Sequence, residues 1–157
     1  MVVVMVVAGR LCVFVRTADH QLIEISPLLS VPATYVEFAK MMTNLLYSRR
    51  LKAVERHNVT LAQVIKNEPK NYLPVDPAAL VALSATADRA VRLTDFAQKF
   101  RQTESPVVFF VGAVAHSHPT AELGLGEECI SIAPFGLTAA ACCSSICAEF
   151  EHQWGIV

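Results

Sequence analysis

Apolar residues cluster in the first 25 positions in a way that is typical of β-strands. Residues 1–8 form an unbroken apolar run. No basic residue precedes this run, as one would in a signal peptide, so we interpret it as a buried strand. Residues 11–15 and 21–25 are two further apolar segments, and the short polar segment 17–20 separates them. This pattern predicts a β-hairpin.

A helical pattern follows the hairpin. Apolar residues recur there at steps of three and four, at Tyr35, Phe38, Met41, Met42, Leu45 and Leu46. Ser30 offers an oxygen for an N-cap, and Pro32 suits an early helical position. The spacing predicts one amphipathic helix of about four turns. It leads into the most basic cluster of the chain, residues 47–52.

The next segment also carries apolar residues at a helical spacing. Thr60 can cap a short helix through Leu61, Val64 and Ile65. Pro69 ends it, because the residue before a proline is disfavoured in the helical conformation.

The second half of the chain alternates apolar runs with helical segments. We expect strands at residues 79–83, 107–112 and 129–132, and helices at residues 94–100 and 137–150. The run at 107–112 is apolar throughout, so its strand should be central and covered on both faces. The chain is therefore predicted to be one α/β domain over residues 1–157, with a mostly parallel sheet at its centre.

Composition bears on assembly. The apolar fraction of 54% and the mean hydropathy of +0.43 are high for a soluble monomer. No apolar run reaches the roughly 18 residues that a membrane helix needs, so no membrane segment is expected. A buried dimer face explains this excess of apolar residues better than a membrane segment does.

Charge is distributed unevenly along the chain. Residues 40–101 contain eleven Lys or Arg against five acids, whereas the residues after Arg101 contain six Glu and no basic residue. A basic middle indicates either an RNA-binding face or an ordinary solvated surface. The charge pattern favours neither.

The five cysteines include no CxxC pair, which fits a reducing compartment. Cys143 and Cys147 lie one helical turn apart with His152 nearby, so a zinc site can be considered. Ala and Ser fill the same segment, which favours packing residues. We therefore expect no metal.

The sequences of several segments resemble those of the ribosomal small-subunit rRNA pseudouridine-N1-methyltransferase family. The matching motifs follow the family's order and spacing over residues 9–156. They are Ala8-Gly9-Arg10-Leu11, Leu22-Ile23-Glu24-Ile25-Ser26-Pro27, Val64-Ile65-Lys66-Asn67, Tyr72-Leu73-Pro74, residues 107–115, Ile130-Ser131-Ile132, Leu137-Thr138-Ala139-Ala140 and Glu151-His152-Gln153-Trp154-Gly155-Ile156.

This resemblance implies a SPOUT-like, trefoil-knotted α/β domain that forms a homodimer and uses S-adenosyl-L-methionine. Carried over position by position, the cofactor pocket would use Leu83, Gly112, Ser117, Ile132, Ala133, Pro134, Phe135, Gly136 and Leu137. These positions follow strands, where open α/β sheets commonly bind ligands. The cofactor supplies its own reactive methyl group, so the protein mainly has to orient the RNA and exclude water.

The sequence also departs from the family's pattern. Relatives carry arginines that are expected to bind the substrate RNA where this chain has Ser30, Ala33 and Glu37. The replacement of these arginines removes phosphate contacts. Arg49, Arg50 and Lys52 are the RNA-binding candidates that remain. Ser117 replaces an expected glycine, and Pro134 lacks an N–H that could bind the ligand. The family's N-terminal segment, with an acid near the active site, has no counterpart, so no catalytic residue is assigned.

Two functions therefore remain open. One is a methyltransferase acting on small-subunit rRNA, with ribosome-assembly factors as further partners. The other is a catalytically inactive assembly factor or structural subunit of a ribosomal particle. The nucleolus or nucleus is the expected location, with the mitochondrion as the alternative. Hydrolysis through Ser117 with His116 or His118 is not expected, because no nucleophile elbow surrounds them.

Overall fold

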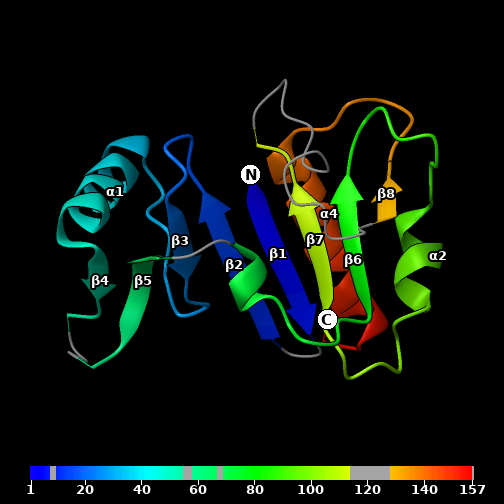
Figure 1. Cartoon of the computed structure of the whole chain (residues 1–157), viewed down its shortest axis with the longest axis horizontal. Coiled ribbons are helices and arrows are strands. Elements are labelled where there is room, and N and C mark those ends of the chain that lie inside the picture. Colours follow the sequence, from blue (N-terminus) through cyan, green and yellow to red (C-terminus); the bar gives the residue numbers. More distant parts are fainter. Residues whose placement is uncertain (8–9, 55–57, 67–68, 114–127, 157) are drawn as a thin grey trace.

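The computed structural model describes residues 1–7, 10–54, 58–66, 69–113 and 128–156. Within these residues, one eight-stranded sheet runs in the order β4-β5-β3-β2-β1-β7-β6-β8, with helices at both ends (Figure 1). The strands are β1 (Val2–Val7), β2 (Arg10–Arg16), β3 (Leu22–Ile25), β4 (Arg50–Lys52), β5 (Thr60–Ile65), β6 (Ala79–Leu83), β7 (Val107–Val111) and β8 (Glu128–Ile130). The helices are α1 (Tyr35–Ser48), η1 (Pro69–Tyr72), α2 (Leu93–Gln98) and α4 (Ala139–Gln153).

The sheet is mixed: the predicted α/β class is confirmed, but the parallel arrangement expected for the centre of the sheet is limited to three strands. Strands β7, β6 and β8 are mutually parallel. The pairings from β4 through β5, β3, β2 and β1 to β7 are all antiparallel. All five residues of β7 are buried, as expected for a strand covered on both faces. The strand predicted at 107–112 is therefore central, as the sequence indicates.

Helices α2 and α4 cover one face of the β1, β7 and β6 region. Phe109 of β7 contacts Phe96 of α2 and Phe150 of α4, with ring centroids 6.2 and 5.6 Å apart, both edge to face. Trp154 extends this cluster, since its ring lies 5.1 Å from that of Phe150. Edge-to-face geometry is favourable for aromatic pairs, so this cluster is the core of that half of the sheet.

Helix α1 covers the other half of the sheet on the same face. Leu45 is its buried residue and packs with Ile23 and Ala62. The helix begins at Tyr35 and is capped by Thr34, whose hydroxyl accepts from the amide of Glu37 at 3.3 Å. The expected cap at Ser30 is therefore wrong. Thr34 and Glu37 form the S/T-x-x-E capping pattern, which satisfies the first turn better.

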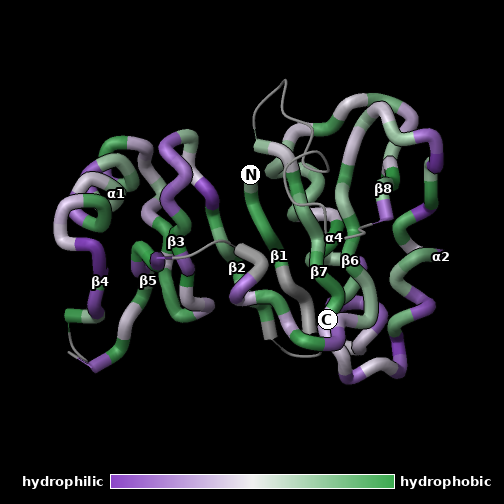
Figure 2. The backbone as a smooth tube through the Cα atoms, viewed as in Figure 1, coloured by the Kyte–Doolittle hydropathy of each residue, from purple (hydrophilic) through white to green (hydrophobic). Residues whose placement is uncertain are grey.

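The opposite face carries a second core. Val3, Phe14 and Phe110 belong to it, and the segment of η1 packs over them, with the ring of Tyr72 5.9 Å from that of Phe14. Figure 2 shows the matching pattern: β1, β7 and β6 are mostly apolar, while the β2–β3 turn and β4 are hydrophilic. Apolar residues therefore concentrate where both faces are covered.

One sequence-based prediction of secondary structure is wrong. Residues 60–65 form the strand β5 and not a helix. Ile23 and Ile25 of β3 pair with Val64 and Ala62, so these residues face α1. Gln63 faces the other way and bonds the carboxylate of Glu24 at 2.6 Å. Alternation of period two, together with β-branched residues, favours the strand over the helix.

Most of the remaining elements agree with the sequence, but β4 and η1 were not predicted. The hairpin of β2 and β3, the strands β6 and β8, and the helices α2 and α4 lie where apolar patterns predict them. Thr138 caps α4 and accepts from the amide of Ala141 at 3.2 Å. In the part of the chain that is described, no helix combines the length and apolarity needed to cross a bilayer.

Candidate functional site

The carboxyl ends of the three parallel strands meet at one level. Leu83, the last residue of β6, pairs with Val111 of β7 and with Ile130 of β8. Figure 1 shows the three arrowheads at the same end of the sheet. Loops that follow neighbouring parallel strands share one edge, which is where α/β sheets commonly bind ligands.

Hydrogen bonds fix the first residues beyond this edge. The amide of Ser84 donates to the carbonyl of Ile130 at 3.0 Å, and the amide of Ser131 donates to the carbonyl of Arg89 at 2.8 Å. The hydroxyl of Ser131, which is buried, donates to the carbonyl of Ala133 at 2.6 Å. An ion pair between Arg89 and Glu128 joins the same two segments. The start of the segment after β8 is therefore held firmly.

The segment of residues 132–137 leads from this edge to the cap of α4. Ile132 packs against the core, while Phe135 is 64% exposed and Leu137 is 36% exposed. Within the described residues, the amides of Phe135, Gly136 and Leu137 donate to no backbone carbonyl. Such exposed N–H groups are strong donors that a ligand can use.

The structure brings part of the predicted cofactor set together. Leu83 and Gly112 adjoin each other across β6 and β7, since Gly112 directly follows Val111. Residues 132–137 leave the sheet at the same edge. Ser117 lies outside the described residues, as do His116 and His118. Neither Ser84 nor Ser131 is among the site residues predicted from the sequence, although each directly follows the end of a strand.

This edge fits the chemistry of S-adenosyl-L-methionine in two respects. Leu83 is apolar and buried, which would suit a position beneath an adenosine. The amides of Phe135, Gly136 and Leu137 could donate to the edge of an adenine or to a carboxylate. Pro134 contributes no donor, as the sequence indicates.

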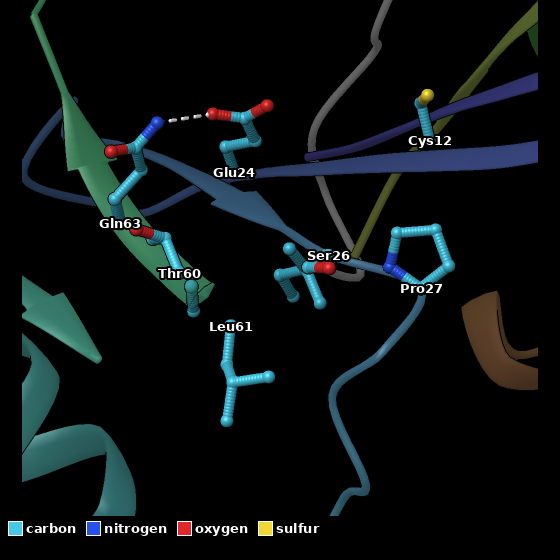
Figure 3. Close-up of a pocket in the computed structure, with 9 residues that line it drawn as sticks. Cys12, Glu24, Ser26, Pro27, Thr60, Leu61 and Gln63 are labelled. Carbon is cyan, nitrogen blue, oxygen red and sulfur yellow. Dashed lines mark hydrogen bonds between the residues drawn. The ribbon is translucent and has the colours of Figure 1, made fainter. Parts of the chain in front are cut away.

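A pocket of about 220 Å³ lies at the opposite end of the strands. The end of β3 and the start of β5 line it, together with Cys12 of β2. Figure 3 shows the side chains of Glu24 and Gln63 pointing toward one another, with Cys12 set apart. The side-chain amide of Gln63 already donates to the carboxylate of Glu24. We assign this pocket no role in binding the cofactor.

The cysteines of α4 are packing residues with suppressed acidity. Burial raises the pKa of the Cys142, Cys143 and Cys147 thiols above the usual 9.0. For Cys147 the nearby carboxylate of Glu151 adds to this increase in pKa. Thiols held in the protonated form are poor metal ligands and poor nucleophiles.

The three RNA-binding candidates lie at the end of α1 and on β4. Arg49, Arg50 and Lys52 are all exposed. Arg49 adopts a left-handed conformation with φ of 64°, and its Nη1 atom donates to Oε1 of Gln21 at 3.1 Å. The structure thus leaves all three side chains accessible to a large polyanion.

Comparison with known proteins gives the chain its family. A model of the family described as "EMG1/NEP1 methyltransferase" matches residues 3–151. The chain belongs to the EMG1/NEP1 methyltransferase family. The match covers all of the described strands except Val2 of β1, and nearly all of α4. The resemblance inferred from the sequence phrases is therefore confirmed.

Curated EMG1/NEP1 relatives from several eukaryotes resemble the chain along most of its length. It is 36% identical over 154 residues to the Drosophila melanogaster protein named ribosomal RNA small subunit methyltransferase NEP1, covering 96% of this chain and 60% of the relative. It is 32% identical over 150 residues to the protein of the same name from Candida glabrata, covering 96% and 63%. The chain thus spans about six tenths of the length of these relatives.

A solved member of the family has the same fold. The crystal structure of Archaeoglobus fulgidus Nep1 bound to S-adenosylhomocysteine matches with a TM-score of 0.67 at 17% identity, covering 89% of this chain and 61% of that one. The SPOUT-like α/β fold is therefore confirmed. The trefoil knot and the homodimer stay predictions.

Proposed function

We propose that this chain binds S-adenosyl-L-methionine and acts as an rRNA methyltransferase in small ribosomal subunit biogenesis, with N1 of a pseudouridine as the target atom. The observation that carries the proposal is the register of Leu83, Val111 and Ile130, which places the ends of the three parallel strands at one edge of the sheet. Relatives named small-subunit rRNA methyltransferases support the substrate class.

The bound cofactor would supply an electrophilic methyl group. The chain's own residues would orient it: Leu83 beneath the adenosine, Gly112 beside it, and the amides of residues 135–137 at its polar edge. Gly112 has no side chain, so a ligand could lie directly on the backbone there. No described residue is assigned as the base that removes the N1 proton.

The first experiment is calorimetric titration of the whole chain with S-adenosylmethionine and S-adenosylhomocysteine. Micromolar binding is expected. The absence of heat, from a protein whose circular dichroism shows a folded α/β domain, would overturn the proposed cofactor. Gly112→Arg should abolish binding because a long side chain would fill the site. Gly112→Ala serves as the milder variant if the arginine disturbs folding.

A second function has its own supporting observation. Ser30, Ala33 and Glu37 stand where the family's arginines are expected, and Glu37 is engaged in the cap of α1, where its carboxylate accepts from the hydroxyl of Thr34 at 2.9 Å. A carboxylate there repels an RNA backbone. The alternative is therefore a catalytically inactive assembly factor or structural subunit of a ribosomal particle.

In-cell complementation separates the two functions. If Gly112→Arg abolishes function while the protein remains folded, cofactor binding is required and the scaffold alternative fails. If the variant complements fully, the enzyme fails. Under either function we propose the homodimer, small-subunit rRNA and ribosome-assembly factors as partners. The nucleolus or nucleus is the proposed location, with the mitochondrion as the alternative.

A further inference from the structure

The candidate cofactor edge continues across the sheet into a second, basic region. Val2 of β1 pairs with Val111 of β7 on one side and with Val15 of β2 on the other. Val15 pairs with Ile23 of β3, which pairs with Val64 of β5. These residues form one row that runs from β5 to β8. Residues one step beyond this row lie at one edge of the sheet.

Basic residues lie at the β2, β4 and β5 part of this edge. Arg16 ends β2, Lys66 follows β5, and the carbonyl of Arg49 accepts a hydrogen bond from the amide of Val64 at 2.9 Å. Segments 15–22, 48–50 and 65–66 contain four Lys or Arg, and Asp19 is their single acid. Their charge is therefore strongly positive, and Figure 2 shows the β2–β3 turn as hydrophilic.

Two of the edge residues hold a backbone conformation that L-residues rarely adopt. Within the described residues, the non-glycine residues with positive φ are His20, at 59°, and Arg49, at 64°. Both belong to this edge. Glycine would adopt either conformation without steric cost, yet both positions carry side chains that can bind anions. Such conformations concentrate at functional sites.

Hydrogen bonds orient these side chains. Nη2 of Arg16 lies 2.9 Å from Nδ1 of His20, and a guanidinium can only donate, so Nδ1 accepts. The proton of the neutral ring then sits on Nε2, as a further donor. The hydrogen bond from Arg49 to the side chain of Gln21 orients the guanidinium. Gln21 is itself held by Thr17, whose hydroxyl accepts from the backbone amide of Gln21 at 3.1 Å.

The spacing suits an RNA strand that also reaches the cofactor edge. Adjacent strands lie about 4.8 Å apart, so the end of β2 at Arg16 is two strand spacings, about 10 Å, from the end of β7 at Gly112, and the end of β5 at Lys66 is four spacings, about 19 Å, from it. A polymer held by its phosphates at these distances can place a neighbouring base at Gly112. Arginine and lysine are the usual phosphate-binding residues.

We propose that Arg16, His20, Arg49 and Lys66 bind backbone phosphates of a single-stranded RNA segment whose target base enters the edge at Leu83 and Gly112. This inference rests on the proposed function for the identity of the second site. The phosphate-binding edge itself can be tested separately. It differs from the helix start at Ser30, Ala33 and Glu37, where the chain lacks basic side chains.

The test measures fluorescence anisotropy of a labelled single-stranded oligouridylate with the whole chain at several salt concentrations. The edge variant is Arg49→Gln with Lys66→Gln. The matched control is Lys99→Gln with Arg101→Gln, which removes the same charge from exposed residues after α2, at the opposite end of the sheet (Figure 1). The edge variant should bind about tenfold more weakly, and its salt slope should fall by about 0.7 for each lost phosphate contact. The control should keep the wild-type affinity.

Three outcomes would contradict the proposed phosphate-binding edge. They are no RNA binding by the wild type, an equal loss of RNA affinity in the edge and control variants, or competition by polyglutamate as strong as that by RNA. The last would indicate an acidic protein partner. S-adenosylhomocysteine titration of the same samples keeps the two proposals apart. If the wild type binds the cofactor and the edge variant binds RNA as tightly as the wild type, only the proposed phosphate-binding edge is contradicted. If RNA binding depends on the edge residues but no cofactor binds, the proposed methyltransferase function is contradicted and the phosphate-binding edge stands.

Discussion

Arg49 at the end of α1 and Gln21 in the β2–β3 turn are joined by a hydrogen bond of 3.1 Å between Nη1 and Oε1. Residues 28 positions apart in the sequence are thereby held at one edge of the sheet. The bond is exposed, so its contribution to stability is small. Its main consequence is to orient a guanidinium whose backbone adopts a disfavoured conformation.

Arg49→Gly should therefore stabilise the protein while weakening RNA binding. Glycine at φ of 64° avoids a steric cost of about 1 kcal/mol and is the preferred residue after a helix. Urea unfolding should show a free energy of unfolding higher by about that amount. Arg49→Ala is the control, since it removes the guanidinium but keeps Cβ. If the alanine and glycine variants are equally stable, backbone strain at Arg49 is not the cause.

Gly136→Val tests the segment after β8 as a ligand site. A Cβ atom at Gly136 would meet nothing within 4 Å, and its φ is not positive, so the free energy of unfolding should change by less than about 0.5 kcal/mol. A branched side chain would cover the neighbouring amides, so the Kd for S-adenosylhomocysteine should rise about tenfold, which corresponds to about 1.4 kcal/mol.

Gly155→Val provides the reverse pattern for comparison. Gly155 has φ of 65°, so valine is strained there and stability should fall. Ligand affinity should not change, because Gly155 follows α4 and lies away from the strand ends. Calorimetry and urea unfolding of both variants check this. An unchanged Kd for Gly136→Val would exclude the amides of this segment as cofactor donors.

Two phenylalanines with opposite exposure should differ in their contribution to stability. Phe109 is fully buried between Phe96 and Phe150, so Phe109→Ala should cost about 3–5 kcal/mol of stability. Phe135 is 64% exposed, so Phe135→Ala should cost almost nothing. Urea unfolding compares the two. A large loss of stability for Phe135→Ala would mean that this side chain is covered in solution, for instance by a second subunit.

The sequence predicts most elements of this fold because their patterns are local. The run Val107–Val111 identifies a central strand, and the steps of three and four in α1 identify a helix. Residues 60–65 are misread because Leu61, Val64 and Ile65 fit a helical spacing equally well. Pairing with β3 decides for the strand, and that pairing is a tertiary contact.

The candidate site is predictable only in part. Family-like phrases point to Leu83, Gly112 and residues 132–137, and the structure aligns the strands that carry them. The basic edge has no such local signal. It depends on the register that places Val15 and Val111 on either side of Val2, which joins segments almost 100 residues apart. His20 offered one clue, since it stands in a four-residue turn between two strands.

The thiols of α4 predict how stability depends on pH. Burial raises the pKa values of Cys142, Cys143 and Cys147 in the folded protein above 9.0, so the folded state keeps protons that the unfolded chain releases. Their contribution to stability is complete below about pH 9 and is lost as the pH rises through the folded pKa values. Urea unfolding at about pH 8 and pH 10 should show this decrease, and it should be smaller in a variant with serine at all three positions.

Alkylation tests the same thiols without unfolding the protein. Cys12 is exposed, whereas Cys142 is buried and Cys143 and Cys147 are partly buried. Iodoacetamide reacts with thiolates, so at neutral pH Cys12 should be modified first and the three helical thiols much more slowly. Peptide mass spectrometry resolves the sites, and alkylation in urea should modify every cysteine at similar rates. Modification of Cys147 in the folded protein as fast as that of Cys12 would show that α4 opens readily, contrary to its packing against β1 and β7.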